Sequence, residues 1–89
     1  MHAVVLMVTI HDPEAAISKL REEVVPVVKQ APGLVTGHWT RKDDSGIGMI
    51  VFESEDAANA ARERAAAMAD ADDNVTLESV EVREVVANV

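Results

Sequence analysis

The segment AVVLMVTI at residues 3–10 is apolar at almost every position, which constrains the fold more than any other feature of the sequence. It lacks the spacing of an amphipathic helix, so we interpret it as a β-strand. Successive side chains of a strand point to opposite faces. Here both sets are apolar: Val4, Leu6, Val8 and Ile10 form one, and Val5 and Met7 belong to the other. A strand of this kind needs a cover on each face of its sheet.

The segment IGMIVFE at residues 47–53 repeats this pattern, with Ile47, Met49 and Val51 opposite Ile50 and Phe52. Burying one aliphatic side chain contributes about 1.5–3 kcal/mol. Leaving four or five of them in water would forgo roughly 6–15 kcal/mol, which is comparable to the whole stability of a small domain. We therefore expect the second face to be covered by the same face of another copy, in a two-fold symmetric homodimer.

Two helices are expected between the strands. The first should begin at Asp12, whose side chain can accept from free backbone amides, with Pro13 in the first turn. Its apolar side would carry Ile17, Leu20 and Val24, and its solvated side Lys19, Arg21, Glu22 and Glu23. Pro26 should kink this helix or end its regular part. The second helix is rich in alanine, begins at Ser54 and should fray at its acidic far end.

Four strands are expected, over residues 3–10, 34–42, 47–53 and 75–86. The order β-α-β-β-α-β is that of ferredoxin-like folds, an α+β class with both helices on one face of a four-stranded antiparallel sheet. In the last strand the apolar side chains change parity after Leu77, so we expect a bulge, a bend or a change of partner near residues 78–79. A chain of 89 residues should form one domain, residues 1–89.

The charge balance excludes several partners. With 8 Lys+Arg against 16 Asp+Glu, the net charge is −8, which would repel nucleic acid and an anionic membrane surface. The absence of cysteine fits a reducing compartment, and the first ten residues lack a basic leader, so we expect a cytoplasmic protein. The three histidines show no metal-ligand spacing, and no Gly-rich phosphate loop is present. We therefore expect no metal and no cofactor.

The second and third strands should form a hairpin. The pairing within this hairpin determines which side chains lie on the same face of the sheet. A four-residue turn at residues 43–46 would pair Trp39 with Ile50 and Gly37 with Phe52. Trp39 would then pack on the helix-covered face. The opposite face, turned toward the interior of a dimeric barrel, would carry Thr36, His38, Thr40, Met49 and Val51.

His38 is the candidate catalytic residue, because imidazole titrates near neutral pH and can act as a general base. The alternative is a structural histidine, hydrogen-bonded at an interface or exposed on an edge strand. Ligand contacts are expected from Thr36, Trp39, Thr40 and Met49. Trp39 could close over a flat ligand or serve only packing, and Arg41 could bind an anionic group or lie in solvent at the hairpin tip.

The entry to the second strand, APGLVTG, resembles the PGF-x-G segment of the dimeric α/β-barrel superfamily. The strand-then-helix segment VFESEDAANAA is also similar to the segment that follows it there. The resemblance covers nearly the whole chain and implies two ferredoxin-like sheets that face each other in a homodimer. The superfamily includes antibiotic-biosynthesis-type monooxygenases, haem-degrading enzymes, muconolactone isomerases and stress-responsive barrels, so it leaves the activity open.

Two departures bear on the activity that the resemblance implies. The haem-degrading members use an Asn, a Trp and a His on different elements, whereas the segment 3–10 has no Asn. The cofactor-free monooxygenases oxidise aromatic polyketides among polar and aromatic groups, whereas this chain has no tyrosine. These departures count against haem degradation and against polyketide oxidation, respectively, as the activity of this chain.

Three hypotheses for the function follow. The first is a homodimer that binds a small apolar ligand in a cavity between sheet and helices. The second is a cofactor-independent monooxygenase or isomerase that acts on a small aromatic or apolar substrate, with His38 as general base. The third is a structural or regulatory dimer whose barrel is filled by its own side chains.

Overall fold

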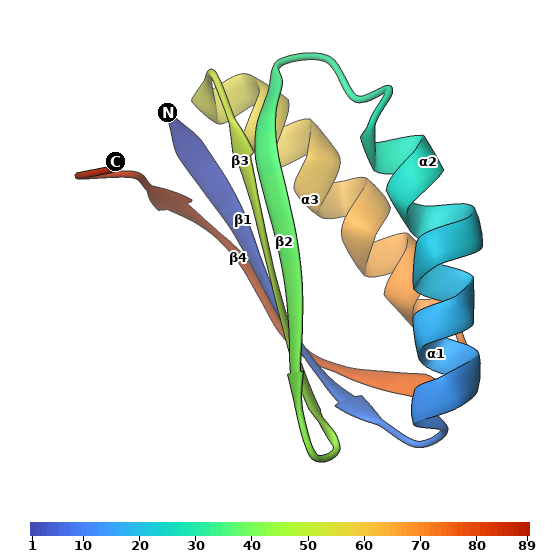
Figure 1. Cartoon of the computed structure of the whole chain (residues 1–89). Helices are drawn as coiled ribbons and strands as arrows, with labels where there is room; N and C mark the ends of the chain where they lie inside the picture. Colours follow the sequence, from blue (N-terminus) through green and yellow to red (C-terminus); the bar gives the residue numbers. More distant parts are fainter.

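The computed structural model describes all 89 residues. The strands are β1 (His2–Ile10), β2 (Leu34–Lys42), β3 (Ser45–Phe52) and β4 (Val75–Glu84). The helices are α1 (Pro13–Lys19), the π-helical turn η1 (Leu20–Val24), α2 (Val25–Val28) and α3 (Glu55–Asp70). The strands form one four-stranded antiparallel sheet in the order β2-β3-β1-β4, and all the helices lie on one side of it (Figure 1). The predicted ferredoxin-like α+β fold is confirmed.

The first helical region follows the predicted start. Asp12 caps α1 by accepting a hydrogen bond from the amide of Ala15 at 3.2 Å. The region then runs on through η1 and α2, with the Val25 amide bonded to the carbonyl of Leu20, five residues back. Pro26 has no N–H, and its ring crowds the carbonyl four residues before it, which a wider turn relieves. The predicted irregularity is therefore a π turn just before Pro26.

Helix α3 begins at the predicted cap, where the Ser54 hydroxyl accepts from the amide of Ala57 at 3.1 Å. Its small side chains let it approach the sheet, and Ala58 is fully buried against Val4, Ile50 and Phe52. None of the helices combines the length and the apolar character needed to cross a membrane.

The last strand contains the predicted bulge. Met7 of β1 pairs with Ser79, while the next residue, Val8, pairs with Leu77. Glu78 is left between the two pairs, and its Oε1 accepts a hydrogen bond from the Thr9 hydroxyl at 3.0 Å. The extra residue keeps the apolar side chains before and after it on the helix-covered face.

The hairpin turn is shorter than predicted, so the predicted partners of Trp39 and Gly37 are wrong. Only Asp43 and Asp44 lie outside the strands, and Asp43 adopts a left-handed φ of 53°. Trp39 pairs with Gly48 instead of Ile50, and Gly37 pairs with Ile50 instead of Phe52. Over residues 36–42 the register differs by two residues, so the side chains there stay on their predicted faces.

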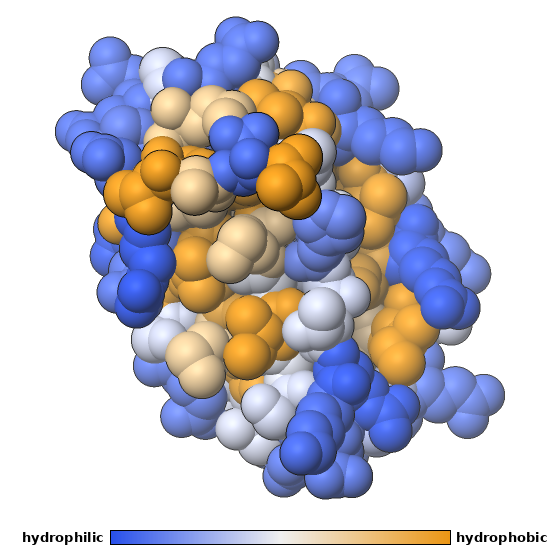
Figure 2. All heavy atoms as spheres, turned by 60° about the vertical axis from the view of Figure 1, so that its left-hand side comes forward, coloured by the Kyte–Doolittle hydropathy of each residue, from blue (hydrophilic) through white to orange (hydrophobic).

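The sheet face away from the helices is apolar along its two central strands. Met7 is 41% exposed, Ile47 41% and Met49 47%, and Val5 pairs with Met49 next to them. We call this surface, made of Val5, Met7, Ile47, Met49 and Val51, the open face. Figure 2 brings this side forward and shows apolar side chains in its middle with polar residues around them.

Candidate functional site: a cavity between sheet and helices

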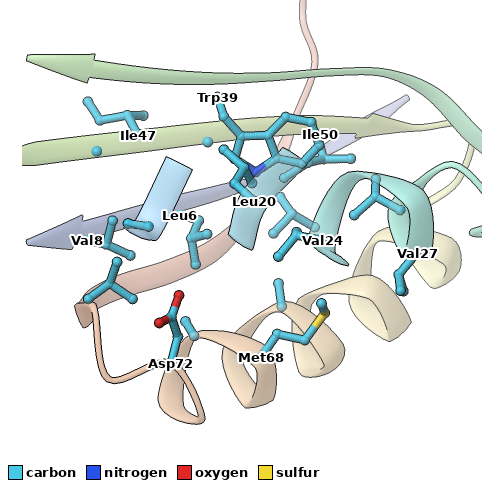
Figure 3. A pocket seen from close by; sticks show the side chains of 18 of the residues that line it. Leu6, Val8, Leu20, Val24, Val27, Trp39, Ile47, Ile50, Met68 and Asp72 are labelled. Carbon is cyan, nitrogen blue, oxygen red and sulfur yellow. The ribbon is translucent and has the colours of Figure 1, made fainter. Parts of the chain in front are cut away.

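A cavity of about 390 Å³ lies between the sheet and the helices. Its floor is the helix-covered side of β1 and β3, and its other walls come from the first helical region and α3. Most of its lining is aliphatic and includes Leu6, Val8, Leu20, Val24, Val27 and Met68 (Figure 3). The helices therefore do not fill the space above the sheet.

Trp39 forms the sheet side of this cavity, and two glycines make room for its indole. A Cβ on Gly48 would lie 3.0 Å from Trp39 Cδ1 and 3.2 Å from Nε1, and one on Gly37 would lie 3.3 Å from Cη2. The indole is half-buried, and its Nε1 makes no hydrogen bond within the chain. Figure 3 shows Trp39 on the sheet side, with Leu20 and Val24 on the helix side. A flat apolar group fits between such surfaces.

The π turn supplies the facing wall. Leu20, Arg21 and Val24 of η1 all line the cavity. The sequence pattern placed Arg21 on the solvated side of the helix, and Arg21 is exposed as predicted, but it also borders the cavity, which the pattern did not predict. A π turn holds more residues than an α turn and changes the side-chain phase, which a 3.6-residue pattern does not anticipate.

Charged side chains line the cavity alongside the aliphatic ones: Arg21, Arg41, Arg64 and Asp72. The Asp72 Oδ1 accepts a hydrogen bond from the Asn74 amide at 2.9 Å and lies 3.9 Å from Lys19 Nζ. Arg41 donates its Nε to the carbonyl of Asp43 at 2.9 Å. Arg21 and Arg64 make no ion pair and no side-chain hydrogen bond.

The residues singled out in the sequence divide between the two faces of the sheet. Trp39 lines the cavity from the helix-covered face. Thr40 borders the cavity but pairs with Ile47 and so shares the face of His38, and its hydroxyl donates to the carbonyl of Ile47 at 3.0 Å. His38 pairs with Met49 and, like Thr36, lies on the far side of the sheet, where all three are exposed. No group of three or more potential metal ligands occurs in the chain.

Comparison with solved structures gives likenesses that span nearly the whole chain. HapK from Hahella chejuensis has a TM-score of 0.77 at 12% identity, over 100% of this chain and 96% of HapK. A variant of SnoaB from Streptomyces nogalater, described as a cofactor-independent oxygenase, has a TM-score of 0.73 at 16% identity, over 99% and 95% of the two chains. This chain has their fold.

A third likeness is to the heme-degrader MhuD from Mycobacterium tuberculosis, with two hemes bound in its active site. Its TM-score is 0.57 at 23% identity, over 97% of this chain and 98% of MhuD. No protein-family model and no curated protein matches the sequence. These likenesses confirm the predicted ferredoxin-like fold.

Proposed function

We propose that this protein binds a small, flat, largely apolar ligand in the cavity beneath Trp39. The observation that carries the proposal is the cavity itself, about 390 Å³ of mainly aliphatic lining with one indole on its sheet side. Ligand sites in proteins occupy about 300–1,000 Å³ and combine such a lining with a few polar groups. Gly37 and Gly48 leave room for the indole against the sheet.

The likeness to SnoaB and MhuD supports this assignment. SnoaB is described as an oxygenase, and the MhuD structure holds hemes in an active site. Both chains have the present fold across almost their whole length. The fold is therefore compatible with a site for a flat organic molecule.

Haem does not fit the lining of this cavity. Protein ligands to haem iron are His, Cys, Tyr or Met. Of these, the cavity offers only Met68, and methionine binds haem iron together with a histidine. His2, His11 and His38 lie outside the cavity, and the chain has neither Cys nor Tyr. The proposed ligand is therefore an organic molecule without a metal centre.

The sole tryptophan makes the proposal directly testable, because with no tyrosine present it dominates the intrinsic fluorescence. We expect the uncharged dye phenylnaphthylamine to bind, to quench Trp39 and to gain emission by energy transfer from it. Ala65→Phe should abolish this binding, because Ala65 lines the cavity on α3 and a phenyl ring would fill it.

Met49→Lys is the control for binding on the open face: it should also separate the proposed dimer, but Met49 does not line the cavity of the protomer. It should not change the affinity for the dye. Binding that survives Ala65→Phe but is lost in Met49→Lys would overturn the cavity as the site.

We also propose that a second copy of the chain covers the open face, giving the homodimeric barrel expected from the sequence. The support is the partial exposure of Met7, Ile47 and Met49 on adjacent strands. His38 and Thr36 would then lie inside the barrel, between the subunits.

We also propose a cytoplasmic location for the protein. The support is the cysteine-free sequence, which fits a reducing compartment.

A second candidate function is a cofactor-independent oxygenase, which the likeness to SnoaB favours. Such a reaction would convert a CH₂ group and O₂ into a C=O group and water, after a base removes a proton from the carbon. Asp72 is the one carboxylate that lines the cavity. His38 could serve as base only for a substrate held inside the barrel, because the sheet separates it from the cavity.

Oxygen uptake with a hydroxylated polycyclic aromatic would test this second candidate. Loss of turnover in Asp72→Asn alone would place the reaction in the cavity, whereas loss in His38→Ala alone would place it in the barrel. No oxygen uptake by the parent protein across a panel of such compounds would contradict the oxygenase.

A further inference from the structure

The charged lining of the cavity is opposite in sign to the rest of the protein. The chain carries twice as many acidic as basic residues, 16 against 8. The cavity lining reverses this ratio, with three arginines and a single aspartate. The arginines come from three separate elements: Arg21 from η1, Arg41 from β2 and Arg64 from α3. Three separate segments thus bring positive charge to one apolar cavity.

The single aspartate does not neutralise these arginines. Asp72 accepts from the Asn74 amide and faces Lys19 instead, and its side chain is 12% exposed. None of the three arginines has a carboxylate within ion-pair distance. This contrasts with Arg83, which is paired with Glu81 on β4.

The guanidinium groups also keep donors available. Arg21 and Arg64 use none of their N–H groups in side-chain hydrogen bonds, and Arg41 uses only Nε, on the carbonyl of Asp43. By comparison, Arg62 lies two residues before Arg64 on α3 and does not line the cavity. Its Nε donates a hydrogen bond to the Val80 carbonyl. A guanidinium presents five N–H donors in a planar fork that matches the oxygens of a carboxylate or sulfonate.

We propose that the ligand is an organic acid: an apolar, flat body that lies against Trp39, with an anionic oxygen group bound by Arg21 and Arg64. The assignment rests on the proposed function, since it names the class of molecule that the same cavity takes. The aliphatic lining receives the body, and the arginines receive the charge. Both arginines are exposed, and the surrounding water weakens each contact and makes it sensitive to salt.

Two dyes that share one ring framework test the proposal. Anilinonaphthalene sulfonate carries an anionic group, and phenylnaphthylamine is its uncharged parent. We expect Arg21→Gln and Arg64→Gln each to weaken sulfonate binding by roughly two- to fivefold, as expected for loss of an exposed charge-assisted contact. Neither variant should change the affinity for the uncharged dye by more than about twofold.

Arg62→Gln is the matched control, because it removes the same charge from the same helix outside the cavity. It should leave the affinity for both dyes unchanged. Salt also screens the repulsion between the dye and the net charge of −8. Raising the NaCl concentration from roughly 0.02 M to 0.3 M should therefore lower the affinity of the parent protein for the sulfonate relative to that of the Arg21→Gln, Arg64→Gln double variant. Circular dichroism of each variant verifies that the fold is retained.

Failure of the acid-binding role and failure of the ligand cavity would give different dye-binding results. If the uncharged dye binds but Arg62→Gln weakens sulfonate binding as much as Arg21→Gln and Arg64→Gln do, the acid-binding role is wrong and the cavity stands. Unchanged sulfonate binding in the double variant has the same meaning. If neither dye quenches Trp39, the proposed ligand cavity itself is wrong.

Discussion

Trp39 is the residue whose placement most directly shapes the candidate site. Its face of the sheet follows from strand parity alone, which is why the sequence predicts it correctly. The contacts of Trp39 do not follow from parity, because they depend on the length of the hairpin turn. Asp43 adopts a left-handed conformation in a two-residue turn, which brings Gly48 opposite Trp39. Parity survives an even change of register, whereas cross-strand partners do not.

Gly48→Ala tests the close approach of the indole to the strand beneath it. A methyl group there would lie 3.0 Å from Trp39 Cδ1, so the indole must move, and we expect a loss of about 1–2 kcal/mol in the free energy of unfolding. Urea unfolding followed by circular dichroism measures this loss.

The Trp39→Ala background provides the control for that measurement. There the added methyl group has no indole to meet, and replacing a strand glycine should stabilise by roughly 0.5–1 kcal/mol. An equal loss in both backgrounds would show that the strand backbone, and not the indole, requires the glycine.

His38 illustrates what residue type alone cannot decide. Its chemistry suggests a general base, but strand alternation places it on the face opposite the cavity, next to Met49. We expect His38→Ala to leave the affinity for phenylnaphthylamine unchanged within about twofold, measured by quenching of Trp39. A large loss of affinity would mean that the dye binds on the open face.

At the scale of elements, the first helical region shows both the reach and the limit of sequence patterns. The cap at Asp12 and the disturbance at Pro26 are predictable because each depends on local chemistry. The form of the disturbance is not predictable from the sequence, because a kinked helix, a helix that ends and a π turn all accommodate a missing N–H. The π turn is the solution that keeps the helix running while bringing Arg21 to the cavity.

Pro26→Ala should allow regular α-helical bonding through this region. We expect a gain of about 1 kcal/mol in unfolding free energy, since proline costs roughly 3 kcal/mol in a helix interior and repacking offsets part of the gain. We also expect weaker sulfonate-dye binding, because an α turn would shift Leu20, Arg21 and Val24 around the helix. A variant with greater stability and unchanged dye affinity would show that the π turn does not shape the site.

The bulge in β4 is predictable for a different reason. The apolar side chains change parity between Leu77 and Val80, and only an extra residue keeps both sides of the change on the covered face. The position of Glu78 follows from that count. Its hydrogen bond with Thr9 of the neighbouring strand requires the three-dimensional register.

At the scale of the whole molecule, the apolar open face is the feature that one chain leaves uncovered. The sequence predicts it because β1 and β3 carry aliphatic side chains of both parities. The cavity is less accessible to sequence reasoning, since it results from the distance between the helices and the sheet. Apolar residues that line a cavity have the same spacing as residues that fill a core.

Ile47→Lys tests the proposed homodimer. A lysine in the middle of the open face would have to be buried at a two-fold interface, which costs several kcal/mol, so we expect the variant to be a monomer. Light scattering on a sizing column at micromolar concentration gives the mass. Val86→Lys is the control, because Val86 is 86% exposed and lies beyond β4, and it should remain a dimer. A monomeric parent protein would contradict the dimer.

The most direct test of the ligand cavity is a crystal structure of the protein with phenylnaphthylamine. We expect electron density for the dye between Trp39 of β2 and Val24 of η1, and none there in an Ala65→Phe crystal grown under the same conditions. Density confined to the open face, or a cavity closed by the protein's own side chains, would contradict the proposed site.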